Sequence, residues 1–384
     1  MNPKPLFGAL VFSLACFASP ALELHSLFTP NAVFQQSVRV PVWGMADPGS
    51  EVMIRFGGQE VSAKADAEGD WIAILEPLVA SNQPRTMMVE SGEEKLEVGG
   101  ILVGEVWVGS GQSNMAWTVE RSLDSEAVAQ AVEEGAYADI RLFKVPVDGT
   151  DTRMGEVSAA WSLPENEVIQ RFSATAFYFA AKLSADRSVP VGMIQSANGG
   201  TNAFSWINSA TYGESDVAAP IREYWATTLR NHPEAMERYK AALEQWKEKV
   251  RAARDSGTPV DGRAPREPLG PEHVKRPSGH YNAMIAPLQP YAIRGVIWYQ
   301  GEANSRLPFY PFYKDLMLEL VEDWRSDWAV ASGGLLERID FPFYLVQLPN
   351  FAGGDAQGWP RIREEMLRFW QEGEGTGMVV AIDK

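Results

Sequence analysis

The sequence is poor in cysteine, histidine and positive charge. Its 384 residues include one cysteine, Cys16, and four histidines. Lysine and arginine total 34 against 50 aspartates and glutamates, so the formal net charge is −16 at pH 7. A single cysteine excludes an internal disulfide. The acidic balance, without a basic patch, argues against nucleic acid and anionic membrane surfaces as partners.

The chain has no apolar run of about 18 residues, the length that a membrane-spanning helix needs. Its N-terminus instead has the pattern of a secretory signal peptide, which we place at residues 1–21. Lys4 provides the positive charge, residues 6–17 are apolar, and Ala18 and Ala21 resemble a cleavage site. We therefore expect export to a periplasm or beyond, and no cysteine in the mature chain. The sequence leaves the oligomeric state open.

The length and patterning predict two domains after the signal peptide. Residues 22–103 contain short strand-like runs separated by glycine-rich turns, which predict a small all-β sandwich. In residues 104–384, apolar strand-like runs alternate with amphipathic helical segments. This alternation predicts an α/β domain of three layers, in which helices cover both faces of a mainly parallel sheet.

An insertion at about residues 209–279 interrupts the α/β pattern. Apolar residues recur in it at helical spacing: Met236, Tyr239, Leu243, Trp246 and Val250. We expect a helix that packs on the sheet domain, with a mobile lid over the site as the alternative.

Three polar clusters each follow directly on an apolar strand-like run. They lie at residues 110–114 (SGQSN), 198–202 (NGGTN) and 300–304 (QGEAN). Ligands of parallel sheets bind at the carboxyl ends of the strands, so we expect the clusters to meet there. Ser113 in the first cluster is a candidate nucleophile, which would need a base and donors for an oxyanion. Taken alone, each cluster also fits an ordinary turn, helix cap or polar loop.

In this order, GQSNM, GGT followed by Trp206, and WYQGEAN resemble the sialate O-acetylesterase family of the SGNH hydrolases. The segments VPVWGMADPG, HYNAMIAPLQPYAIRGVIWYQGEAN and FPFYLVQLPNF extend the resemblance over nearly the whole chain. The resemblance implies an SGNH-type esterase domain acting on O-acetylated sugars, sialic acids among them. It implies no metal and no organic cofactor.

The resemblance also implies roles for individual residues. Ser113 would be the nucleophile, and the oxyanion would be bound by the backbone N–H groups of Ser113 and Gly200 and by the amide of Asn304. We expect five further motif residues to bind substrate: Gln112, Asn114, Trp206, Gln300 and Glu302.

The charge of sialic acid adds one more candidate. Its carboxylate would be repelled by a protein at −16 unless a local cation offset the repulsion. Arg306 lies two residues beyond the third cluster and is the expected partner. The alternative is that Arg306 is a solvated surface residue.

Two departures from the family pattern bear on function. Phe204 occupies a position where the family often has a glutamate, two residues before Trp206. The family's catalytic histidine lies in an Asp-x-x-His segment after a strand resembling GMVVAID, and this sequence stops at Lys384, at that point. Of the four histidines present, His280 is the best candidate for a base, although none follows a core strand. We expect a truncated chain that lacks its base and whose own activity is doubtful.

These observations predict an exported carbohydrate O-acetylesterase with a serine acyl-enzyme mechanism. A deacetylase of xylan or another plant polysaccharide is the alternative substrate interpretation. A catalytically silent sugar-binding homologue is the alternative from another functional class.

Overall fold

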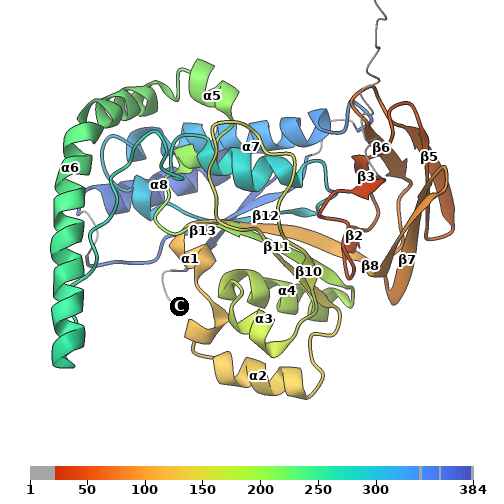
Figure 1. Ribbon diagram of the computed structural model, residues 1–384, viewed down its shortest axis with the longest axis horizontal. Helices are drawn as coiled ribbons and strands as arrows, with labels where there is room; N and C mark the ends of the chain where they lie inside the picture. Colours follow the sequence, from red (N-terminus) through yellow and green to blue (C-terminus); the bar gives the residue numbers. More distant parts are fainter. Residues whose placement is uncertain (1–21, 337–339, 354–355, 382–384) are drawn as a thin grey trace, which may run out of the picture.

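The computed structural model describes residues 22–336, 340–353 and 356–381 (Figure 1). The predicted signal peptide, with Cys16, lies outside the described residues. Within these ranges, no helix combines the length and the apolar character that crossing a membrane requires.

The N-terminal part of the chain forms two small groups of strands. Strands β1 (Glu23–Leu24), β3 (Val40–Met45) and β6 (Asp70–Leu75) make a three-stranded sheet. The second group comprises β2 (Val33–Gln35), β4 (Glu51–Phe56), β5 (Gln59–Lys64), β7 (Ser81–Ser91) and β8 (Glu94–Gly111). In β4, buried Val52, Ile54 and Phe56 alternate with less buried neighbours, as expected of a strand with one face in the core.

Strand β8 joins this unit to the rest of the molecule. It has 18 residues and runs through the boundary predicted between 103 and 104. Its first part pairs with β7 and β2, and its last part is a central strand of the α/β sheet. The core is also continuous, because the ring of Tyr291 packs 5.6 Å from that of Phe28 and its hydroxyl donates to the carbonyl O of Val33 at 2.8 Å.

The large sheet has the order β10-β9-β11-β8-β12-β13-β14. The strands not yet given are β9 (Ile140–Lys144), β10 (Trp161–Ser162), β11 (Val191–Ala197), β12 (Gly295–Tyr299), β13 (Phe343–Gln347) and β14 (Thr376–Val380). Pairing is parallel from β9 to β14, and β10 is antiparallel to β9. All seven residues of β11 are buried, as expected of a parallel strand covered on both faces. The predicted mixed α/β fold with an N-terminal β unit is confirmed.

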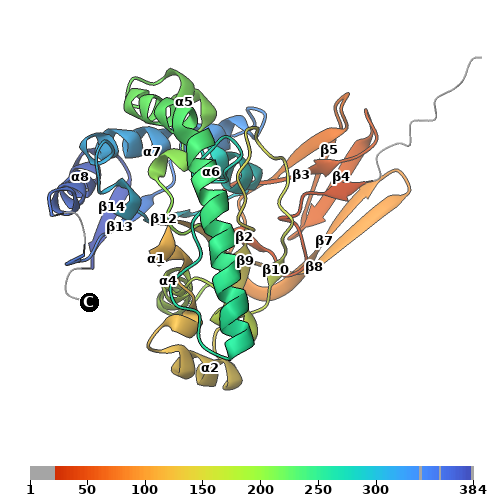
Figure 2. The ribbon, with the colours of Figure 1, turned by 60° about the vertical axis from the view of Figure 1, so that its left-hand side comes forward.

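Helices lie on both sides of this sheet (Figures 1 and 2). One side carries α1 (Ser113–Ala116), α2 (Ser125–Glu133), α3 (Asn166–Gln170) and α4 (Ala174–Arg187), and the other carries α7 (Tyr313–Val330) and α8 (Gly358–Glu372). The short helical turns are η1 (Val119–Arg121), η2 (Ala203–Ser205), η3 (Tyr281–Ile285, a π-helix), η4 (Ala286–Leu288), η5 (Glu302–Asn304) and η6 (Tyr310–Phe312). Helix α7 packs through residues at helical spacing, and its Trp324 ring lies 6.0 Å from that of Phe343 in β13.

The insertion contains α5 (Ser209–Glu214) and the 38-residue helix α6 (Ala219–Ser256). The predicted helix is therefore confirmed, and it packs on the sheet domain near its start, where the ring of Tyr224 lies edge-on 4.9 Å from that of Phe309. Farther along, the five apolar residues whose spacing predicted the helix are only half-buried or exposed. The returning segment 257–279 lies against α6 instead, and His232 bonds to the carbonyl O of Leu269 at 3.0 Å.

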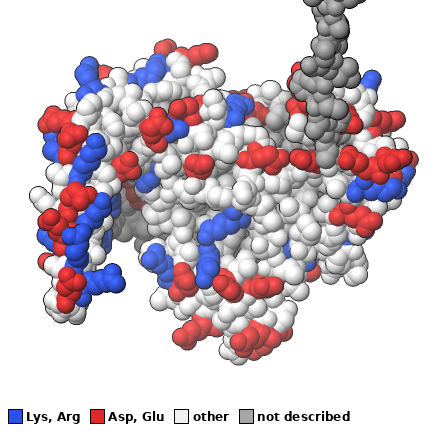
Figure 3. Space-filling view, in the orientation of Figure 1, with Lys and Arg blue, Asp and Glu red and all other residues white. Residues whose placement is uncertain are grey.

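Charged side chains explain why most of α6 can face solvent. Lysine, arginine, aspartate and glutamate are interspersed along it (Figure 3). They form pairs one helical turn apart, such as Lys247 with Glu244 at 2.7 Å and Lys240 with Glu237 at 3.4 Å. Such exposed pairs contribute about 0.3–0.5 kcal/mol each, so they support the helix weakly.

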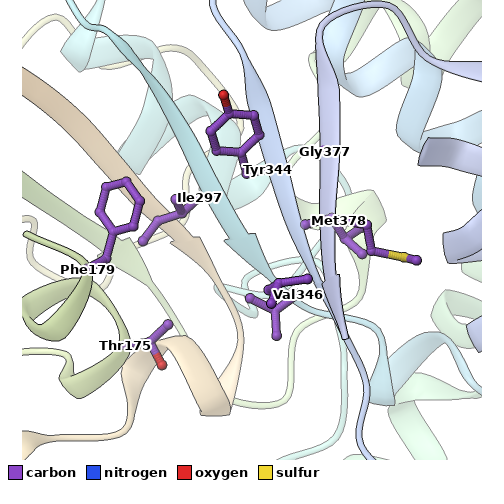
Figure 4. Close-up of a pocket in the computed structure, with 9 residues that line it drawn as sticks. Thr175, Phe179, Ile297, Tyr344, Val346, Gly377 and Met378 are labelled. Atoms are coloured by element: carbon purple, nitrogen blue, oxygen red, sulfur yellow. The ribbon is translucent and has the colours of Figure 1, made fainter. Parts of the chain in front are cut away.

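An apolar pocket of about 480 Å³ opens on the α4 side of β12, β13 and β14 (Figure 4). Phe179 of α4, Ile297, Tyr344, Val346 and Met378 are among the residues that line it. The pocket lies on the face of the sheet and not at the carboxyl ends of its strands. The polar clusters lie instead at the strand ends.

Candidate active site

The three polar clusters meet at one edge of the sheet. Strands β11, β8 and β12 are adjacent and parallel, and each is followed directly by one cluster. A Cβ atom built on Gly199 would lie 3.7 Å from the Cβ of Ser113, so the first and second clusters are in contact. The predicted meeting of the clusters is confirmed.

Ser113 is presented to solvent by a tight turn at the end of β8. It is exposed and begins helix α1. Gly111 before it has φ +133°, and a side chain there would collide with the carbonyl O of Tyr299 at 2.3 Å, so only glycine fits. The Ser113 N–H lies in the first turn of α1, where backbone donors have no intrahelical partner. Gln112 Nε2 approaches the Ser113 Oγ at 3.5 Å.

Gln112 and Gln300 stabilise the site through buried hydrogen bonds. The Oε1 of Gln112 accepts hydrogen bonds from Gln300 Nε2 at 3.2 Å, from the N–H of Gly301 at 3.3 Å and from that of Ala303 at 3.2 Å. Gln112 is 2 % exposed and Gln300 is fully buried. Both were predicted to bind substrate. The structure instead buries them beneath the site, where their hydrogen bonds connect the first cluster to the third.

The side-chain amide of Asn304 is fixed in one orientation. Its Oδ1 accepts from the N–H of Ala203 at 3.0 Å and from Gln300 Nε2 at 2.7 Å. Its Nδ2 is buried, and within the described residues no group accepts a hydrogen bond from it. Buried donors almost always have a partner, and exceptions commonly have a functional reason. A fixed, unpaired N–H donor is what an oxyanion site requires.

Glu302 couples the third cluster to the residue after the nucleophile. Its Oε1 accepts from Asn114 Nδ2 at 2.7 Å, and Asn114 is further held by Thr175, whose Oγ1 donates to its carbonyl O at 3.2 Å. Burial raises the pKa of Glu302 to about 7, although the bond from Asn114 opposes the rise. Glu302 can therefore exchange a proton near neutral pH.

Trp206 was predicted to contact the sugar, and the structure corrects this. Its ring is fully buried, its Nε1 donates to Thr201 Oγ1 at 3.1 Å, and it packs edge-on against Trp298 at 6.0 Å. It therefore supports the second cluster from within. Phe204 is also buried and stacks 5.8 Å from Phe309, so this position forms part of the core and not a polar wall.

His280 lies beside the second cluster, but the hydrogen bonds of its two ring nitrogens do not suit it to act as a base. Its Nδ1 faces the carbonyl O of Asp148 at 2.7 Å, which requires the proton on Nδ1. Its Nε2 then accepts from Asn198 Nδ2 at 3.0 Å. Burial lowers its pKa to about 4, so the ring is neutral at physiological pH. Both nitrogens are engaged, which indicates a structural role.

The remaining histidines also bond elsewhere: His25 to the carbonyl O of Gly155 at 2.8 Å, His232 to that of Leu269 at 3.0 Å, and His273 to the N–H of Lys275 at 3.0 Å. Within the described ranges, no histidine is hydrogen-bonded to Ser113. The same ranges contain no group of three or more His, Cys, Asp or Glu side chains arranged to hold a metal ion.

Arg306 is exposed and makes no ion pair within the part of the chain that the structure describes. Its pairing with a substrate carboxylate stays a prediction. The cation that does contact the second cluster is Lys275, whose Nζ donates to the carbonyl O of Gly199 at 2.6 Å. No motif pointed to Lys275, because it lies 76 residues along the chain in the returning segment of the insertion.

Comparisons with known proteins agree with this arrangement. No family model matches the chain. Sialate O-acetylesterase of Mus musculus is 26% identical over 389 residues, and that of Homo sapiens is 28% identical over 346 residues. These alignments cover 94% and 84% of this chain. The chain spans 68% of the mouse relative and 56% of the human one.

A solved structure shows the same fold. The crystal structure of a carbohydrate acetylesterase from Xanthomonas citri superposes with a TM-score of 0.71 at 28% identity, covering 94% of this chain and 68% of that one. The fold and the strand-end serine thus place the protein among the carbohydrate esterases. Within that class, the chain is similar to the sialate O-acetylesterases, at 26–28% identity over most of its length.

Proposed function

We propose that this protein is an exported carbohydrate O-acetylesterase of the SGNH type, which removes acetyl groups from sugars such as sialic acids. One observation carries the proposal: exposed Ser113 adjoins the second cluster, and the amide Nδ2 of Asn304 is oriented, buried and without an acceptor among the described residues. The names of the relatives, sialate O-acetylesterase and carbohydrate acetylesterase, support the choice of an acetylated sugar.

The mechanism follows from these groups. Ser113 Oγ attacks the carbonyl carbon of the acetyl ester, and the carbonyl oxygen becomes an oxyanion. The N–H groups of Ser113 and Gly200 and the Nδ2 of Asn304 stabilise that oxyanion; loss of one such donor typically costs about 3 kcal/mol of the barrier. Collapse of the tetrahedral intermediate expels the sugar oxygen, which takes up a proton. Water then hydrolyses the acetyl-serine to acetate and free enzyme.

Two steps of this mechanism need a base, first for the Ser113 proton and then for the water. Because the histidines of the described residues bond elsewhere, none of them is assigned as this base. The proposed mechanism requires a histidine oriented by a carboxylate, as in the Asp-x-x-His segment of the family pattern.

The location and the exact sugar are also proposals. The pattern of residues 1–21 supports export. The relatives' names favour sialic acid over xylan or another plant polysaccharide. A catalytically silent sugar-binding protein is the second candidate, because no histidine contacts Ser113 in the described ranges.

A deacetylation panel tests these alternatives. The full-length gene product, with Ser113→Ala as its matched control, is incubated with O-acetylated sialic acid, acetylated xylan and a simple aryl acetate, and released acetate is measured. Release from the sialate that depends on Ser113 supports the proposal. Release from xylan alone supports the plant-polysaccharide alternative. Sugar binding without release from any ester supports the silent homologue.

A further inference from the structure

Lys275 reaches from the insertion into the turn that follows β11. Its Nζ donates to the carbonyl O of Gly199 at 2.6 Å and approaches that of Gly200 at 3.4 Å. Its own backbone is held on both sides: its N–H donates to Nδ1 of His273 at 3.0 Å, and its carbonyl O accepts from Ser205 Oγ at 2.9 Å. The ammonium group is therefore placed by the fold and is not a freely moving surface charge.

The contact with Gly199 determines the direction of the next N–H group. The carbonyl of Gly199 and the N–H of Gly200 belong to one trans peptide, whose C=O and N–H point in opposite directions. Because Lys275 binds the carbonyl end, the N–H of Gly200 points away from the ammonium. Gly200 has φ +69°, and a Cβ on it would lie 3.3 Å from the Lys275 Nζ, so glycine suits the turn.

The same contact strengthens Gly200 as a donor. A cation on a carbonyl oxygen withdraws electron density from the amide, and hydrogen bonds linked in this way reinforce one another by roughly 10–30% per bond. The turn adjoins the nucleophile, since a Cβ on Gly199 would lie 3.7 Å from that of Ser113.

The surroundings of the ammonium make its charge sensitive to pH. Burial lowers the pKa of Lys275, and the positive charge of Arg266 lowers it further. Burial lowers the pKa of His273 and of His280, and the positive charge of Lys275 lowers both further. Within the described part of the chain, no carboxylate forms an ion pair with Lys275.

We propose that Lys275 is a positioning residue for the esterase reaction, which orients and polarises the Gly199–Gly200 peptide so that the N–H of Gly200 binds the oxyanion. The proposal rests on the proposed function, because it assigns Lys275 a role in that chemistry. Lys275 itself contacts neither the substrate nor the reacting atoms.

Steady-state kinetics of the full-length gene product test the proposal. Lys275→Met should lower kcat about 10–100-fold with less than about a twofold change in KM, since the donor acts mainly in the transition state. Lys275→Arg should recover part of the loss. Lys249→Met, which removes an exposed lysine of α6, is the matched control and should change neither constant. A raised KM with unchanged kcat would show that Lys275 binds substrate and would overturn the proposal.

The dependence of kcat on pH is a second measurement, which a merely structural role of Lys275 would not affect. The cationic form is the active one, so kcat of the unsubstituted protein should fall as the pH rises through the lowered pKa of Lys275. Lys275→Met should lack this alkaline limb. An identical limb in both proteins contradicts the proposal.

Glycine-selective ¹⁵N labelling separates this inference from the proposed function. The amide resonance of Gly200 should shift in Lys275→Met and, in the unsubstituted protein, should titrate with Lys275. A Gly200 resonance insensitive to both changes overturns the positioning role. A protein that hydrolyses no ester contradicts the proposed function and, with it, the catalytic part of the role, while the resonance still decides whether Lys275 orients the peptide.

Discussion

Gln300 donates its side-chain Nε2–H to the Oδ1 of Asn304 at 2.7 Å, and this bond decides how the Asn304 amide faces. A second bond to the same oxygen, from the N–H of Ala203, excludes the flipped orientation, which would place two donors against each other. The Nδ2 of Asn304 thereby keeps its N–H groups without an acceptor among the described residues, as the proposed oxyanion role requires. Gln300 thus orients the amide for which that role is proposed.

Asn304→Ala is expected to lower kcat by about 10²–10³ with a smaller change in KM, because the amide stabilises charge that develops only in the transition state. Steady-state kinetics on an acetylated sugar measure this. The substitution also leaves the N–H of Ala203 without its acceptor, so we expect a loss of about 1–3 kcal/mol in the free energy of unfolding. An effect confined to KM would show that Asn304 binds the ground state.

Glu302→Gln should change how stability depends on pH. The pKa of Glu302 is raised by burial from 4.5 to about 7, so the folded state binds this proton more tightly than the unfolded state. Its contribution to stability is present below pH 4.5 and is lost as the pH rises to 7, by up to about 3 kcal/mol.

Glutamine keeps the acceptor for Asn114 and cannot ionise, so the variant should gain stability relative to the unsubstituted protein between pH 5 and pH 8. Urea unfolding at both values measures the gain. Glu68→Gln, at an exposed position, serves as the control. Equal pH dependence in the Glu302 variant and the unsubstituted protein would show that the carboxyl is already ionised at pH 5.

The 384-residue chain by itself should hydrolyse esters slowly, because in the described ranges no histidine contacts Ser113. His280→Ala should leave that slow rate nearly unchanged. It should reduce the free energy of unfolding, since Asp148 and Asn198 lose a buried partner, at about 1–3 kcal/mol per unpaired group. Rapid turnover by this chain that disappears in His280→Ala would identify His280 as the base.

Arg306→Ala tests recognition of a charged sugar. If Arg306 pairs with the carboxylate of sialic acid, the variant should raise KM for acetylated sialic acid several-fold and leave neutral acetylated sugars unchanged. Added salt should weaken the sialate reaction only, because exposed charges are screened. Equal changes with both kinds of substrate would favour a neutral polysaccharide.

The placement of the clusters could be predicted from the sequence because it depends on local rules. Each cluster follows an apolar run, and the ends of adjacent parallel strands must meet at one edge. The orientation of Asn304 could not be predicted, since it depends on Gln300 and on Ala203, which lies 101 residues away in the chain. The contact of Lys275 with Gly199 could not be predicted either, because the two residues are 76 positions apart in the chain.

The expectations for α6 and for Trp206 were wrong because a sequence pattern does not identify the surface against which a residue packs. Helical spacing in α6 correctly indicated an amphipathic helix, but Trp246 of its apolar stripe lies against Gly262 in the returning segment 257–279, where an added Cβ would be 3.7 Å from the ring, and not against the sheet domain. A tryptophan in a polar motif suggested a sugar contact, yet Trp206 is fully buried between the second cluster and the core.

Acetyl transfer to Ser113 is the most direct test of the account. The protein is mixed with an activated aryl acetate, quenched in acid and digested, and the acetylated peptide is identified by mass spectrometry. We predict an acetyl group on Ser113, less of it in Asn304→Ala, and none at this position in Ser113→Ala, whose folding should be intact because Ser113 is exposed. Acetyl label confined to other residues, or ester hydrolysis that survives in Ser113→Ala, would contradict the account.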